Sequence, residues 1–138
     1  MPHRIDTYPE SPKLLRKLMA HGLDPNRPDW LGKTFLHGCA EKGDRSAAAV
    51  FLDAGADINA WDLEFKGTPL AAAVRHGDRC EEDQSKLTKP GRRMVEFLLK
   101  CGAATNLPGD EPWATPLAWA RKRGLADIEE ILLKHGAK

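Results

Sequence analysis

A glycine-centred pattern recurs along this chain with a nearly constant period. Four segments of similar composition each end at a glycine, namely Gly22, Gly55, Gly102 and Gly136. The intervals between these glycines are 33, 47 and 34 residues, so a unit of about 33 residues recurs and its middle copy carries 13 additional residues. A unit of this length cannot bury its own apolar face. The chain is therefore expected to fold as a stack in which neighbouring units cover one another.

A second marker keeps the same register. A threonine is followed two residues later by a leucine in the segments TFLH, TPL and TPL, which begin at Thr34, Thr68 and Thr115. Together with the segment LDAGADIN at 52–59, these residues resemble the ankyrin repeat family, and the resemblance covers nearly all of residues 13–138. It implies an all-α fold, an ankyrin-repeat solenoid of stacked helix-turn-helix units with β-hairpin loops.

The residues around each marker are typical of helix ends. Threonine can cap the N–H groups at the start of a helix, and proline at the first helical position lacks an N–H that would go unpaired. Each closing glycine suits the left-handed conformation that ends a helix. We expect one domain over residues 1–138. It comprises a cap helix and hairpin at 11–29 with Ser11 as the helix cap, a repeat at 30–62, a repeat at 63–110 and a capping repeat at 111–138.

The additional residues of the middle repeat lie at about 79–91, between its two helices. Their sequence, RCEEDQSKLTKPG, is polar and of mixed charge. One interpretation is a solvated extension of the loop, because loops tolerate insertions at a low entropic cost. The alternative is an element that contacts a partner.

The composition narrows the classes of function. The 138 residues include 21 Lys and Arg against 20 Asp and Glu, for a net charge of +1, and 41% are hydrophobic. These values argue against wholesale disorder and against a strongly basic nucleic-acid binder. No stretch approaches the ~18 consecutive apolar residues of a spanning helix, and the N-terminus holds no apolar run of signal-peptide length. We therefore expect neither a membrane nor a nucleic acid as the partner.

The cysteine and histidine residues form no pattern typical of a disulfide framework, a metal site or a catalytic site. Cys39, Cys80 and Cys101 are odd in number and far apart in the sequence, which predicts neither a disulfide framework nor a zinc site. A reduced, cytoplasmic protein without a cofactor is the simplest interpretation. No motif of a hydrolase, a phosphate-binding loop or a dinucleotide site occurs, so the chain is not expected to be an enzyme. His37 occupies the histidine position of the family's TPLH motif, and the resemblance implies that it bonds backbone groups and holds the hairpin.

The resemblance also implies a binding surface, a concave face formed by hairpin tips and by the exposed ends of the first helices. The helix-end row comprises the positions seven and eight residues after each marker threonine, which are Glu41, Lys42, Arg75, His76, Lys122 and Arg123. Four of the six are Lys or Arg, so a partner with an acidic segment would be complementary, although an ordinary solvated surface is the alternative. With the hairpin tips added, the predicted partner-binding residues are Trp30, Leu31, Lys33, Lys42, Phe65, Arg75, His76, Trp113, Lys122 and Arg123.

Three of the tip residues are aromatic. Trp30, Phe65 and Trp113 are typical of binding anchors, because large rings supply contact area at a low entropic cost. The alternative is that each ring folds back over its own repeat and covers apolar surface. Trp119 lies in a first helix and is expected to pack.

The sequence therefore favours a non-catalytic, monomeric module that binds another protein. The alternative is a dedicated regulator, inhibitor or effector protein that acts on one enzyme, and it would use the same surface. A catalytic role has no supporting motif. Binding of nucleic acid through the helix-end row would be weak and steeply dependent on salt.

Overall fold

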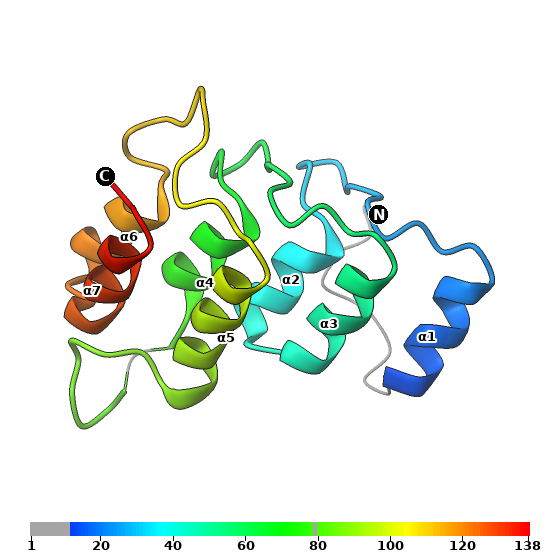
Figure 1. Ribbon diagram of the computed structural model, residues 1–138, viewed down its shortest axis with the longest axis horizontal. Helices are drawn as coiled ribbons and strands as arrows, with labels where there is room; N and C mark the ends of the chain where they lie inside the picture. Colours follow the sequence, from blue (N-terminus) through cyan, green and yellow to red (C-terminus); the bar gives the residue numbers. More distant parts are fainter. Residues whose placement is uncertain (1–11, 79) are drawn as a thin grey trace.

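The structure is a computed structural model that describes residues 12–78 and 80–138 (Figure 1). Ser11, the expected helix cap, lies outside these residues. The described part of the chain contains helices and no strand, which confirms the all-α prediction. The helices are α1 (Pro12–Ala20), α2 (Phe35–Lys42), α3 (Arg45–Asp53), α4 (Pro69–His76), α5 (Lys89–Lys100), α6 (Pro116–Arg123) and α7 (Ala126–Lys134).

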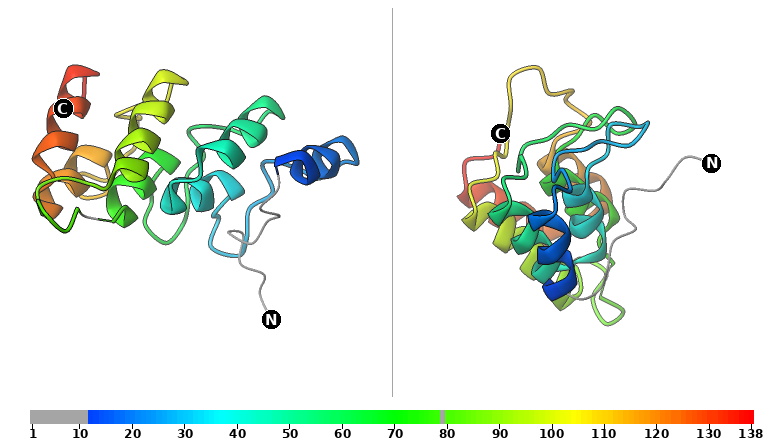
Figure 2. Two further views of the ribbon diagram at one scale, coloured as in Figure 1. Left: turned by 90° about the horizontal axis from the view of Figure 1, so that it is seen from below. Right: turned by 90° about the vertical axis from the view of Figure 1, so that its right-hand side faces the viewer.

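The helices form two layers along the stack (Figure 2). The inner layer contains α2, α4 and α6, which pack against one another in that order, and each also packs against the outer helix that follows it. The outer layer contains α1, α3, α5 and α7. The loops that precede the inner helices project from one edge of the stack, the upper edge in Figure 1. We call these hairpin loops (residues 29–33, 62–67 and 110–114), together with the exposed ends of the inner helices, the inner face.

The marker threonines begin the inner helices as predicted. The hydroxyl oxygens of Thr34, Thr68 and Thr115 each accept a hydrogen bond from the backbone N–H three residues later, at 3.4, 3.3 and 3.1 Å. Proline takes an early position in α4 and α6, where its missing N–H costs nothing. The four closing glycines have φ angles of 98°, 99°, 97° and 92°, in the left-handed region that ends a helix.

The apolar core runs between the two layers. The marker leucines Leu36, Leu70 and Leu117 are buried at equivalent positions of successive repeats. Phe35 stacks on Phe51 with ring centroids 5.0 Å apart, which joins α2 to α3. The alanines that follow Leu70 are also buried, and their small side chains let the inner helices approach closely.

Asparagine side chains connect each hairpin region to the next. Asn59 Oδ1 accepts a hydrogen bond from the backbone N–H of Ala104 at 2.9 Å. Asn26 Nδ2 donates to the carbonyl oxygen of Gly55 at 3.0 Å, and Asn106 Nδ2 donates to a carbonyl oxygen near the C-terminus at 3.2 Å. These bonds fix the spacing between repeats at the same edge that carries the inner face.

The middle repeat departs from its neighbours between α4 and α5. Residues 77–88 separate these helices, whereas two residues separate α2 from α3 and α6 from α7. α5 also has 12 residues where α3 and α7 have 9, because residues 89–91 form its first turn. The sequence analysis places residues 89–91 in the inserted loop, so that boundary is corrected here. Leu87 is only 4% exposed and belongs to the core, so the loop is attached to the stack near its end.

Candidate functional site

An ion-pair network lies on the inner face between the first two full repeats. The two carboxylate oxygens of Glu41 bind different cations, Lys33 Nζ at 2.7 Å and Arg75 at 2.9 Å. The side chains of Glu41 and Arg75 are only 10% and 14% exposed. Pairs that are partly withdrawn from water are screened less than surface pairs, so this network fixes the helix ends relative to the first hairpin.

Aromatic contacts continue the network into the last repeat. The Arg75 guanidinium lies 3.6 Å from the centroid of the Phe65 ring. Phe65 meets Trp119 edge to face at 6.3 Å, and Lys122 Nζ lies 5.1 Å from the centroid of the Trp119 ring. We call this series the inner ladder; it consists of Lys33, Glu41, Arg75, Phe65, Trp119 and Lys122.

A buried aspartate positions Phe65 in the second hairpin. Asp62 is 5% exposed, and its two carboxylate oxygens accept the backbone N–H groups of Gly67 at 2.9 Å and Phe65 at 3.0 Å. In the first hairpin Asp29 does the same for Leu31, at 2.8 Å. The sequence analysis missed these residues, although an aspartate five or six positions before each marker threonine is a visible signal.

His37 joins the first full repeat to the second. Its Nδ1 accepts the backbone N–H of Thr34 at 3.2 Å, and its Nε2 therefore carries the proton that it donates to the carbonyl oxygen of Gly67 at 3.0 Å. Burial lowers the pKa of His37, because the charged ring would lose its hydration. The expected structural role of His37 is confirmed.

The helix-end row is less available than its sequence indicates. Arg75 is paired with Glu41, as described above. Arg123 donates to the carbonyl oxygens of Val74 at 2.8 Å and Gly77 at 2.7 Å, and so satisfies the end of α4. The other predicted binding residues of that row, Lys42, His76 and Lys122, are exposed.

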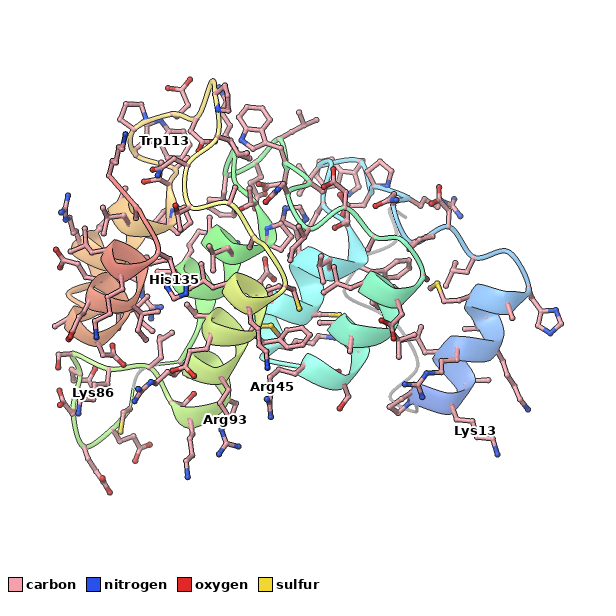
Figure 3. The ribbon with its side chains drawn as sticks, in the orientation of Figure 1. Lys13, Arg45, Lys86, Arg93, Trp113 and His135 are labelled. Atoms are coloured by element: carbon pink, nitrogen blue, oxygen red, sulfur yellow. The ribbon has the colours of Figure 1, made fainter. Side chains whose placement is uncertain are left out.

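Large apolar side chains are exposed along the hairpin edge. Trp30 is 67% exposed, Leu63 63%, Trp113 50% and Trp61 42%. Figure 3 shows Trp113 on the hairpin loop that precedes α6, at the edge of the molecule. The sequence analysis included Trp30 and Trp113 among the binding residues but left out Leu63 and Trp61, which lie on the rising arm of the second hairpin.

Phe65 differs from the exposed tryptophans, because it folds back onto the inner ladder. With Leu31, Lys33, Arg75 and Trp119 it lines a depression of about 10 Å³. That volume is close to the minimum for one water molecule, whereas small-molecule sites usually measure hundreds of Å³. The depression on the inner ladder is therefore too small for an organic ligand.

The described residues show no metal-binding cluster and no membrane-spanning helix. Residues 12–78 and 80–138 contain no group of three or more His, Cys, Asp or Glu side chains that could hold a metal ion. Within the same residues, every helix is too short or too polar to cross a bilayer. All three cysteines have free thiols.

Comparisons with known proteins agree with this architecture. A crystal structure of an ankyrin repeat domain from Acinetobacter baumannii AYE superposes with a TM-score of 0.74 and 34% identity, over 91% of this chain and 59% of that one. The putative ankyrin repeat protein YahD of Escherichia coli K12 is 31% identical over 137 residues, which are 99% of this chain and 63% of YahD. The transient receptor potential channel pyrexia of Drosophila melanogaster is 33% identical over 87% of this chain and 11% of its own length. No protein-family model matches the chain.

The repeat register, the two helical layers and these similarities show that the chain has the fold of the ankyrin repeat family. Domains of this family generally serve as modules for protein–protein interaction and not as catalysts. The chain spans less than two thirds of YahD and of the Acinetobacter domain, and about a tenth of pyrexia.

Proposed function

We propose that this chain binds a partner protein through its inner face, with the exposed tryptophans and leucine of the hairpin edge as the principal contacts. The supporting observation is that Trp30, Trp61, Leu63 and Trp113 are all 42% or more exposed, and that they lie in the hairpin loops or, for Trp61, directly before the second one. Tryptophan is enriched among the residues that dominate binding energy, because it buries a large area with few rotatable bonds.

The inner ladder gives these contacts a fixed base. Glu41, Arg75, Phe65 and Trp119 hold one another across three repeats, so little side-chain freedom is left to lose when a partner binds. Rigid positioning of this kind favours affinity by lowering the entropic cost of association.

Charge contributes less on this face than the sequence suggests. Glu41 compensates Lys33 and Arg75, while Arg123 is directed to backbone carbonyls. An acidic segment of the partner would therefore meet mainly Lys42, His76 and Lys122, the exposed members of the helix-end row. We assign the larger share of the binding energy to apolar contact.

The experiment is recovery of the partner from an extract of the native host, with identification by mass spectrometry. The bait variant changes Trp30 and Trp113 to serine. The matched control changes Leu133, which is 46% exposed on the outer helix α7 and lies outside the hairpin loops. We expect the tryptophan variant to lose the partner while circular dichroism remains unchanged, and the Leu133→Ser control to retain it.

Retention of the same partner by a folded tryptophan variant would overturn the proposal. The dedicated-regulator alternative uses the same face, and it is tested by assaying the recovered partner with and without the chain. A change in enzymatic activity on binding would favour a regulator, and an unchanged activity would favour a module that only connects proteins.

A further inference from the structure

A second surface with a different chemistry lies between the outer helices α3 and α5. Arg93, Glu96, Phe97 and Lys100 occur at helical positions i, i+3, i+4 and i+7 and therefore share one face of α5. With Arg45 from the first turn of α3, these residues line an open groove of about 340 Å³. In Figure 3, Arg45 and Arg93 lie beside each other on the edge opposite Trp113.

The groove carries positive charge that no residue within 12–78 or 80–138 neutralises by an ion pair. Arg45, Arg93 and Lys100 are exposed, and their side chains make no hydrogen bond or ion pair with any described residue. The acidic side chain of the groove, Glu96, is already paired with Arg92 at 2.9 Å. Three cations without an ion-pair partner in the described part of the chain thus line one groove, although the net charge of the chain is only +1.

An aromatic ring forms the apolar part of the groove. Phe97 packs against the core and remains partly exposed between the cations. A ligand that fits must therefore combine negative charge with at least one apolar group.

The groove is open because α5 packs mainly against helices other than α3. The first turn of α5 packs against the turn between α2 and α3, where Pro90 lies close to Gly43. α5 packs against α2, α4 and α7 and makes little contact with α3. The space beside α3 consequently stays accessible along α5 from Arg93 to Lys100.

We infer that the α3–α5 groove binds an acidic peptide segment of a partner protein, with carboxylates paired to Arg45, Arg93 and Lys100 and one apolar side chain against Phe97. Charge complementarity identifies the occupant, and arginine favours carboxylates because its guanidinium can bind both oxygens. The recessed position of Phe97 suits an inserted side chain better than a flat lipid surface. This site is separate from the inner face, so both surfaces can be occupied at once.

The test uses a fluorescent peptide of about 12 residues that is rich in Asp and Glu and has one central leucine. Binding to the full chain is measured by fluorescence polarisation at low and at physiological salt. The groove variant is R45E/R93E/K100E. The matched control is K13E/R16E/K17E, which reverses three exposed cations on α1 and changes the net charge equally.

We expect the groove variant to weaken binding about tenfold or more, and the α1 control to weaken it about twofold or less. A peptide with serine in place of leucine should bind more weakly than the leucine peptide. Circular dichroism checks the fold, and if the charge-reversed groove unfolds the chain, R45Q/R93Q/K100Q replaces it.

Four results would overturn the inference. They are no saturable peptide binding, an equal loss in both variants, equal affinity for the serine and leucine peptides, and tighter groove-dependent binding of anionic vesicles or single-stranded RNA. Sedimentation gives a fifth. A dimer that only the groove variant abolishes would assign this surface to a second copy of the chain.

Discussion

The first and last full repeats join their helices in one way, and the middle repeat joins them in another. Gly43 after α2 and Gly124 after α6 adopt left-handed φ angles of 71° and 68°, and their own backbone N–H groups bond the carbonyls at the helix end. Gly77 after α4 also donates its backbone N–H to a helix carbonyl, that of Ala73, but its conformation is extended, with φ −62° and ψ 141°. The chain then continues into the twelve-residue loop.

The difference shows what an insertion requires of its surroundings. Once the tight turn is lost, the last carbonyls of α4 need another donor, and Arg123 of the next repeat supplies it. The far end of the loop returns to the core through Leu87. The two-residue turns are thus stabilised by their own backbone hydrogen bonds. The long loop depends on side-chain contacts with other parts of the stack.

Removal of the loop's apolar contact should have the largest effect. Leu87→Ala is expected to lower the free energy of unfolding by about 2–4 kcal/mol, because it leaves a cavity in the core. Chemical denaturation followed by circular dichroism measures it. Leu63→Ala, at a side chain that is 63% exposed, is the control and should change stability by about 0.5 kcal/mol or less. Equal effects at the two positions would show that the loop is merely solvated.

Loss of the donor from the last repeat should come next. Arg123→Met keeps much of the side-chain volume and leaves the carbonyl oxygens of Val74 and Gly77 without that donor, at an expected cost of about 2 kcal/mol. The control is Arg121→Met, which removes a surface ion pair with Glu129 worth about 1 kcal/mol or less. If Arg123→Met lowers the free energy of unfolding no more than Arg121→Met does, Arg123 is not the donor that stabilises the end of α4.

The histidine of the first full repeat should give a smaller effect that depends on pH. Burial lowers the pKa of His37, so the unfolded chain takes up a proton at a higher pH than the folded chain does. Its contribution to stability is therefore complete above pH ~6.5, the ordinary pKa of histidine, and declines as the pH falls below that value.

Urea unfolding at pH 7.5 and pH 5.5 measures this dependence. His37→Gln should cost about 1 kcal/mol at the higher pH through the weakened bond to Gly67, and it should reduce the loss of stability at the lower pH. His21→Gln, at an exposed histidine, is the matched control. If the His37 variant loses as much stability between pH 7.5 and pH 5.5 as the unchanged chain does, His37 is not the source of the pH dependence.

The tip of the long loop should matter least to the fold. Backbone bonds from Cys80 to Lys86 and from Thr88 to Asp78, both 2.8 Å, close the loop below its tip. Replacement of residues 81–85 by an Asn-Gly turn should therefore change the free energy of unfolding by about 0.5 kcal/mol or less. A large loss, seen by thermal denaturation, would show that the tip itself supports the stack.

Sequence register predicts the parts of this fold that each repeat makes for itself. The threonine caps and the left-handed glycines follow from local spacing alone. The role of His37 was implied by the family resemblance, and its bond to the carbonyl oxygen of Gly67 reaches the next repeat. The inserted segment illustrates the limit. Leu87 is one apolar residue in a polar stretch, and only the return path of the loop shows that it enters the core.

The sequence predicts where the inner face lies, but it predicts less well which side chains pair with one another there. Glu41 and Arg75 occupy the same register position in adjacent repeats, so their opposite charges were a signal of pairing. The direction of the Phe65 ring and of the Arg123 guanidinium depends on tertiary contacts between repeats, which no local pattern encodes. The assignment of the partner-binding residues stays a prediction.

Hydrogen–deuterium exchange of the chain with and without its recovered partner tests the proposed function most directly. The proposal predicts slowed exchange in the three hairpin loops, residues 29–33, 62–67 and 110–114, when the partner is bound. Exchange that is unchanged in all three loops at saturating partner would contradict binding through the inner face.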